Sequence, residues 1–289
     1  MARISYVNGA YLLHSEAMVH IEDRGYQFAD GIYEYFAFYN RTLLDASLHF
    51  KRLERSLREL QIAPPMSMAA LAIVIRELID RNGRDDGGVY LQVTRGVARR
   101  DHPFPKHTKP ALSITVCGPK TPKPQEIKNG VQAITHPDHR WYRRDIKSVS
   151  LLANVIAKQE ASKHGVREAW LVMEDDKVSE GSVSNAYIVG AKNEIVTHPA
   201  DTHILGGVTR DVVLKLARAN DIKVVEKAFT VSDVKYAAEA FITSTSANVL
   251  PLVRLDDIVI GKGKPGPVTQ KLMALYNAHI LAQTGKIFE

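Results

Sequence analysis

The chain of 289 residues has a net charge of +6 and is 45% apolar, a composition typical of a soluble globular protein with one large or two medium domains. Its basic residues are interleaved with acids, so the charge does not favour nucleic-acid binding, and no apolar stretch approaches the roughly 20 residues of a membrane span. Cys117 is the only cysteine, which excludes an internal disulfide framework. Because the N-terminal residues also lack the apolar core of a signal peptide, we expect a cytoplasmic protein.

The first part of the chain is predicted to mix strands and helices. Apolar residues recur at helical spacing from 47 to 60, and a second helix is expected from 68 to 81. Ser67 is the expected N-cap of that second helix, and Gly83 lies just past its end. Strands are expected at 4–7, 17–21, 89–94 and 111–116.

A proline-rich segment divides the chain. Three prolines fall between Cys117 and Gln125, where they disfavour both helix and central strand, so we expect a fairly stiff linker. The predicted domains are a smaller one at 1–118 and a larger one at 126–289, joined by a linker at 119–125. In the larger domain we expect strands at 131–135, 168–173, 184–189 and 240–243, and helices at 151–164, 209–220 and 268–282. The fold class is therefore α/β or α+β, with two unequal domains and the active site expected between them.

Two short motifs after the linker carry candidate chemistry. Lys147 lies in Asp145-Ile-Lys-Ser148, and Glu180 lies in Ser179-Glu-Gly-Ser182. A lysine amine can hold an aldehyde cofactor as a Schiff base, and a carboxylate can keep a pyridinium nitrogen protonated. Taken alone the pair is a weak signal, because most lysines are solvated and most Glu-Gly dipeptides are turns.

A third motif could bind an anion. Leu205-Gly-Gly-Val-Thr-Arg210 is a glycine turn that leads directly into a predicted helix. Backbone N–H groups at a helix N-terminus, with nearby hydroxyls, bind phosphate groups well. Val208 and Thr209 would supply first-turn donors and Thr245 a hydroxyl. Gly-Gly before a helix is, however, more often only a turn that connects two elements and binds no ligand.

Together with other segments, these motifs make the chain resemble the class IV aminotransferases of the fold-type IV pyridoxal-phosphate enzymes, and within them the branch specific for D-amino acids. The resemblance covers nearly the whole chain and is carried by several separated motifs. They are Asp23-Arg-Gly-Tyr-Gln-Phe-Ala-Asp-Gly-Ile-Tyr-Glu34, His49-Phe-Lys-Arg52, Gln92-Val-Thr-Arg-Gly96, Arg140-Trp-Tyr-Arg-Arg-Asp-Ile-Lys-Ser148, Glu180-Gly-Ser182, Gly206-Gly-Val-Thr-Arg-Asp211 and Thr243-Ser-Thr245.

The resemblance implies pyridoxal 5′-phosphate as cofactor and assigns a role to each candidate residue; no metal is expected. Lys147 would form the Schiff base and then move a proton between the substrate Cα and the cofactor C4′ carbon. Glu180 would pair with the pyridine nitrogen, and Arg140 would support the ring oxygen or Glu34. The remaining implied cofactor contacts are Leu205 beneath the ring and Val208, Thr209, Thr245 and Arg52 at the phosphate.

The resemblance also implies how the substrate is bound. Tyr33, Arg100 and His102 would bind it, the latter two gripping its carboxylate from the loop after the predicted strand at 89–94. In the family this loop crosses into the neighbouring subunit's site, so a homodimer with shared active sites is implied. Tyr35 stands where we expect a small apolar residue, and Arg99 and Asp101 add charge to the loop, so substrate scope is open.

The expected reaction transfers the amino group of a D-amino acid, such as D-alanine, to a 2-oxo acid, such as 2-oxoglutarate, by a ping-pong cycle. The alternatives are a branched-chain L-amino acid aminotransferase, an R-selective amine transaminase and aminodeoxychorismate lyase. The Arg100-x-His102 pair favours the D-specific enzyme over these three. A nucleic-acid-binding protein is an alternative suggested only by the sequence pI of about 9.2, and neither nucleic acid nor membrane is an expected partner.

Overall fold

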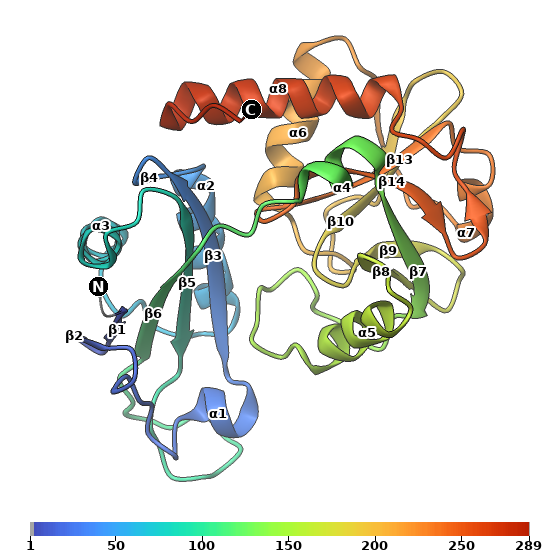
Figure 1. Ribbon diagram of the computed structural model, residues 1–289. Coiled ribbons are helices and arrows are strands. Elements are labelled where there is room, and N and C mark those ends of the chain that lie inside the picture. The colour runs from blue at the N-terminus through green and yellow to red at the C-terminus, as the bar shows by residue number, and fades with distance from the viewer. Residues whose placement is uncertain (1–2, 289) are drawn as a thin grey trace. The chain divides into compact units, whose positions relative to one another are not determined.

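The computed structural model describes residues 3–288, and these form two compact units (Figure 1). The first unit comprises the chain up to Lys120 together with 146–150 and 282–286. The second comprises 121–145, 151–281 and the residues from 287 onward. The chain thus passes between the units at the proline-rich segment. Two features differ from the predicted contiguous domains, because the segment 146–150, which carries Lys147, and the segment 282–286 both belong to the first unit.

The first unit is built on an antiparallel sheet with the strand order β2-β1-β6-β5-β3-β4. Its elements are β1 (Ile4–Val7), β2 (Ala10–Leu13), α1 (Arg24–Phe28), β3 (Gly31–Tyr39), β4 (Thr42–Leu43), α2 (Ala46–Glu59), α3 (Met68–Asn82), β5 (Gly87–Thr94) and β6 (Ala111–Cys117). Because side chains alternate across a strand, Ile32 and Phe36 of β3 enter a core shared with Leu57 of α2 and Ile75 of α3. Tyr33, between them in sequence, points to the opposite face of the sheet.

The second unit contains a mixed sheet with the strand order β12-β11-β10-β13-β14-β7-β8-β9, with β15 paired to β14. Strand β7 runs parallel to both β8 and β14, and β11 runs parallel to β12. The strands are β7 (Val131–Pro137), β8 (Glu168–Val172), β9 (Val178–Gly181), β10 (Asn185–Val189), β11 (Ile195–Thr197), β12 (Val224–Glu226), β13 (Glu239–Ser244), β14 (Asn248–Leu255) and β15 (Ile258–Val259). The helices are α4 (Pro124–Asn129), α5 (Leu152–Lys163), α6 (Val208–Ala219), α7 (Val231–Val234) and α8 (Pro267–Thr284), of which α8 ends in the segment 282–286 of the first unit.

Most predicted elements are confirmed within a few residues, and the predicted caps of α3 are present. Ser67 accepts a hydrogen bond from the backbone N–H of Ala70, and Gly83 adopts a left-handed conformation with φ of 58°. The start of α4 at Pro124 falls inside the predicted linker, since proline is well tolerated in the first turn of a helix. Among residues 3–288, no helix is both long enough and apolar enough to cross a membrane.

The strand predicted at 17–21 is wrong. This segment has no regular structure, and Met18, Val19 and Ile21 are exposed. Its apolar residues resemble a strand in sequence, but an isolated extended segment needs a partner strand, which sequence periodicity does not reveal. Strand β3 was not predicted, because nearly all of its residues are buried or half-buried, so its sequence does not alternate between apolar and polar.

Candidate active site

Lys147 is held against the beginning of β3 in the first unit. Its carbonyl accepts a hydrogen bond from the N–H of Tyr33 at 2.9 Å, and the N–H of Val149 donates to the carbonyl of Gly31 at 3.1 Å. The side chain is half-buried, with Nζ 4.1 Å from the centre of the Tyr33 ring. Tyr33 in turn stacks on Tyr90 of β5, with ring centres 5.6 Å apart. The strand pairing therefore fixes the backbone of Lys147 and places its amine over an aromatic face.

A buried ion cluster lies on the other face of β3. The carboxylate of Glu34 accepts hydrogen bonds from Arg52 Nε at 2.7 Å and Nη2 at 2.9 Å, and it lies 2.9 Å from His49 Nδ1. Helical spacing brings His49 and Arg52, three residues apart on α2, to the same carboxylate. Burial opposes ionisation, but the Arg52 guanidinium and His49 hold the pKa of Glu34 well below its usual range. Burial lowers the pKa of His49, so the imidazole is neutral and donates from Nδ1.

Glu180 is the last residue but one of β9 in the second unit, and both of its oxygens have partners. It accepts hydrogen bonds from Arg140 Nη1, from Asn185 Nδ2 at 2.9 Å, and from the N–H of Leu205 at 3.1 Å. Burial raises the pKa of Glu180, and the Arg140 guanidinium opposes this by favouring the carboxylate. Arg140 is also bound by Asp138 at 2.8 Å, and although burial disfavours its charge, the two acids raise its pKa above its usual value.

Asn185 connects this acid to the predicted anion-binding turn. Besides donating to Glu180, its Nδ2 donates to the carbonyl of Leu205 at 2.9 Å. A Cβ atom at Gly207 would collide with Asn185 Oδ1, so the turn can approach this closely only with glycine. Helix α6 begins directly after Gly207, which has no side chain to cap its first N–H groups. Asn185 therefore joins the buried carboxylate of Glu180 and the turn before α6 in one arrangement.

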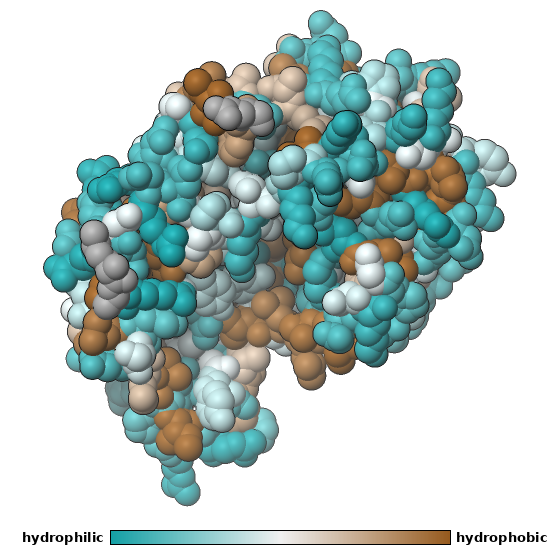
Figure 2. All heavy atoms as spheres, in the orientation of Figure 1, coloured by the Kyte–Doolittle hydropathy of each residue, from teal (hydrophilic) through white to brown (hydrophobic). Residues whose placement is uncertain are grey.

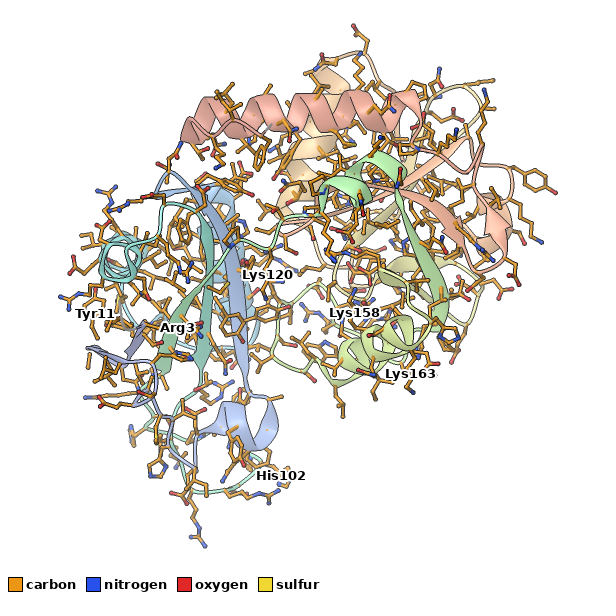
Figure 3. All side chains as sticks on the ribbon, in the orientation of Figure 1. Arg3, Tyr11, His102, Lys120, Lys158 and Lys163 are labelled. Atoms are coloured by element: carbon orange, nitrogen blue, oxygen red, sulfur yellow. The ribbon has the colours of Figure 1, made fainter. Side chains whose placement is uncertain are left out.

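The structure also locates the remaining candidates. Thr209 is buried in the first turn of α6, and Thr245 lies half-buried in the turn after β13. Arg100 and His102 are exposed on the loop after β5, and the side chains of both contact Phe28 of α1. His102 is labelled beside that helix in Figure 3.

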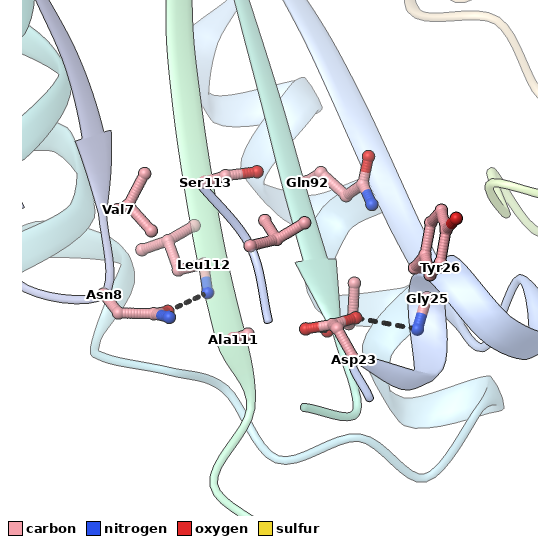
Figure 4. A pocket seen from close by; sticks show the side chains of 11 residues that line it. Val7, Asn8, Asp23, Gly25, Tyr26, Gln92, Ala111, Leu112 and Ser113 are labelled. Atoms are coloured by element: carbon pink, nitrogen blue, oxygen red, sulfur yellow. Dashed lines mark hydrogen bonds between the residues drawn. The ribbon is translucent and has the colours of Figure 1, made fainter. Parts of the chain in front are cut away.

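A pocket of about 150 Å³ opens elsewhere in the first unit (Figure 4). It is lined by residues of β1, β5 and β6 and by the start of α1, including Asp23 and Gln92. None of the predicted cofactor or substrate residues lines it, so it is distinct from the predicted site.

The family model of class IV amino-transferases matches residues 31–255, which include Lys147, Glu180 and the start of α6. The chain belongs to the class IV aminotransferases. It is similar to the D-alanine aminotransferase of Bacillus licheniformis, with 44% identity over 279 residues that cover 96% of this chain and 98% of that protein. The D-alanine aminotransferase of Staphylococcus haemolyticus is 41% identical over 276 residues, covering 95% of this chain and 97% of that protein.

Solved aminotransferases share the fold. The branched-chain amino acid aminotransferase of Escherichia coli has a TM-score of 0.90 at 21% identity and covers 100% of this chain and 97% of its own. The branched-chain enzyme of Thermobaculum terrenum, solved in its PLP-form, has a TM-score of 0.83 at 21% identity and covers 98% of this chain and 95% of its own. At these identities the likeness concerns the fold alone. The predicted family and fold class are confirmed.

Two residues that shape the surroundings of Glu180 were not predicted from the sequence. Asn185 was overlooked, although it follows closely on the Glu-Gly-Ser motif and begins β10. Glu168 of β8 was also overlooked; its buried carboxylate accepts hydrogen bonds from the hydroxyls of Ser182 and Ser184 and so shapes the turn after Glu180. A buried acid in an apolar strand is the signal that could have identified Glu168.

Proposed function

We propose that the protein is a pyridoxal-phosphate-dependent aminotransferase that moves the amino group of a D-amino acid, such as D-alanine, to a 2-oxo acid, such as 2-oxoglutarate, by a ping-pong cycle. Similarity to D-alanine aminotransferases over nearly the full chain supports the substrate class. The observation that carries the cofactor assignment is the buried Glu180, tied through Asn185 to the start of α6.

The second unit offers what the cofactor needs. The first N–H groups of α6 suit a phosphate, with Val208, Thr209 and the hydroxyl of Thr245 as the proposed donors. Leu205 is placed by its own N–H bond to Glu180 and is proposed to pack beneath the ring. When bound, the cofactor supplies an electron-withdrawing ring that stabilises negative charge at the substrate Cα.

Glu180 is proposed to hold the pyridine nitrogen protonated. Each carboxylate oxygen can accept more than one hydrogen bond, so its present donors leave room for a ring N–H. Burial raises the pKa of Glu180, and the Arg140 guanidinium opposes this by favouring the charged form that this role needs. In the same proposal Lys147 supplies the amine that binds the aldehyde and moves the proton at the substrate Cα.

Arg52 is proposed to reach the phosphate while its guanidinium stays paired with Glu34. The pair is bidentate through Nε and Nη2, which fixes the plane of the guanidinium before any ligand binds. Tyr33, Arg100 and His102 are proposed to bind the substrate, the latter two through its carboxylate.

We further propose a homodimer in which the loop that carries Arg100 and His102 completes the active site of the neighbouring subunit. Helix α5 carries Leu152, Val155 and Ile156 at helical spacing, and these are 74%, 59% and 54% exposed. Val183, 58% exposed, follows Ser182, whose carbonyl accepts a hydrogen bond from Asn154 of the same helix. Apolar residues that gather in this way on a largely hydrophilic surface favour a protein partner (Figure 2). The expected cytoplasmic location remains a prediction.

One experiment tests the reaction. Purified protein is loaded with pyridoxal phosphate, and D-alanine or L-leucine is added separately while the visible absorption of the bound cofactor is followed. We expect D-alanine to bleach the band and to yield pyruvate when 2-oxoglutarate is supplied. Bleaching by L-leucine with no response to D-alanine would replace this proposal with a branched-chain enzyme.

A further inference from the structure

The loop that carries Arg100 and His102 is anchored by charged side chains that are not among the residues proposed to bind cofactor or substrate. Arg24 of α1 is 3% exposed, and its guanidinium donates from Nη1 to the carbonyl of Asp101 and from Nη2 to the carbonyl of His102 at 3.2 Å. Hydrogen bonds from a charged donor are stronger than those between neutral groups. The backbone on which the two proposed recognition side chains stand is therefore fixed by one guanidinium.

Asp30 links the contact between Arg24 and the loop to a second contact with the loop, which Arg95 makes. Its Oδ2 accepts from Arg24 Nε at 2.8 Å and from Arg95 Nε at 2.7 Å, and its Oδ1 accepts from Arg95 Nη2 at 3.0 Å. The guanidinium carbon of Arg95 lies 3.6 Å from the centre of the Phe104 ring, further along the same loop. Asp30, whose side chain is 10% exposed, thus binds both arginines that contact the loop. One of them binds the loop backbone, and the other lies over the ring of Phe104.

Phe28, at the end of α1, contacts the recognition side chains themselves. The guanidinium carbon of Arg100 lies 5.1 Å from the centre of its ring, within the range of a cation–π contact, and the His102 ring lies 5.4 Å away. The guanidinium carbon of Arg24 lies 4.8 Å from the same ring centre. The ring is therefore a shared support for both exposed side chains.

Helix α1 is itself held firmly, so it can serve as a fixed support. The carboxylate of Asp23 accepts from the N–H of Gly25 at 2.8 Å, drawn in Figure 4, and from the hydroxyl of Thr94 at 2.9 Å. The N–H of Arg24 donates to the carbonyl of Gly96. A side chain at Gly25 would collide with Thr94, so the helix lies directly on the end of β5.

We propose that Phe28, Arg24 and Asp30 are positioning residues that set the orientation of Arg100 and His102 and thereby the affinity for the carboxylate of the amino-acid substrate. This inference rests on the proposed function and extends it to residues that touch neither substrate nor cofactor. Without them the loop backbone or the side chains of Arg100 and His102 sample many orientations, and ordering them costs conformational entropy on each binding event.

The test compares Phe28→Leu with Tyr26→Leu in the cofactor-loaded protein. Tyr26 is on the same helix and 72% exposed, so it is a matched control. We expect Phe28→Leu to raise KM for D-alanine by about three- to tenfold, the size of a lost cation–π and ring contact, with kcat and the cofactor absorption little changed. Arg24→Gln should raise KM by about tenfold or more, because it frees the loop backbone. Tyr26→Leu should leave KM at the wild-type value.

Two further readouts separate positioning from general damage. In a chain that already carries Arg100→Ala and His102→Ala, Phe28→Leu should change KM no further, because it acts through those side chains. Tryptic cleavage after Arg99 and Arg100 should be faster in Phe28→Leu and Arg24→Gln than in the control, a result that requires no activity. An unchanged KM in Phe28→Leu, or an undiminished effect in the chain lacking both recognition side chains, overturns the inference. A wild-type protein inert towards D-amino acids overturns the proposed function instead.

Discussion

Replacing Arg140 should show how much the stability of the fold depends on the ion pair between this guanidinium and the buried carboxylate of Glu180. In Arg140→Met the carboxylates of Glu180 and Asp138 lose a partner that is 8% exposed, while Asn185 and the N–H of Leu205 remain on Glu180. Breaking a buried ion pair from one side costs about 3–5 kcal/mol, because an uncompensated charge stays in a medium of low dielectric constant. For a chain of this size that corresponds to a fall in melting temperature of roughly 10 °C.

The loss should depend on pH in a defined direction. With Arg140 gone, burial raises the pKa of Glu180 further, so the folded variant binds a proton that the unfolded chain releases. Stability of the variant therefore falls as the pH rises through that raised pKa, and the gap to wild type is widest at neutral pH. The double variant Arg140→Met/Glu180→Gln should recover part of the loss, because it leaves no charge at position 180.

Thermal melts of the wild type, Arg140→Met and Arg140→Met/Glu180→Gln between pH 5 and 8 measure these effects. Arg143→Met is the control, because Arg143 is nearby in sequence and pairs with Asp145, but its side chain is 36% exposed. If Arg140→Met melts no lower than this control, or if the second substitution at Glu180 lowers stability further, the buried pair is not what stabilises this part of the second unit.

Other outcomes follow from the same geometry. Lys147→Ala should abolish transamination while the far-ultraviolet circular dichroism stays that of wild type; turnover at a sizeable fraction of the wild-type rate would assign the proton transfer to another residue. Glu180→Gln should slow the first half-reaction, followed by stopped-flow absorption, far more than it weakens cofactor binding, and equal rates would remove Glu180 from the mechanism. Because the pKa of Glu34 is lowered, its stabilising contribution is complete above about pH 4.3 and is lost as the pH falls through its folded value. The lowered pKa of His49 adds a loss that begins below about pH 6.5, so urea midpoints should fall steadily on acidification, and less steeply in a Glu34→Gln/His49→Gln chain. Arg100→Ala should weaken use of D-alanine by about one to two orders of magnitude, and co-expression with a Lys147→Ala chain should restore activity in heterodimers; verified heterodimers without recovery would show that the loop does not serve the neighbouring site.

The sequence by itself determined the family, and it predicted which residues would carry the chemistry. Lys147 and Glu180 could be chosen because their short motifs resemble those of the class IV aminotransferases, where an amine forms the Schiff base and a carboxylate faces the pyridine nitrogen. Helices α2 and α3 could be predicted because their apolar residues repeat at 3.6-residue spacing, which is a local property. Such features depend on neighbours a few positions away, so the order of residues is enough to find them.

The tertiary structure alone decided which charges meet. Arg52 pairs with Glu34 because α2 packs on the face of β3 from which the Glu34 side chain points. The spacing of the two residues in the sequence does not predict this pairing. Asp30 joins Arg24 and Arg95 because the end of α1 and the end of β5 lie together. A buried charge must find an opposite charge wherever the fold provides one, since desolvation penalises it otherwise. Its partner is therefore fixed by packing between distant segments, which only the folded chain brings together.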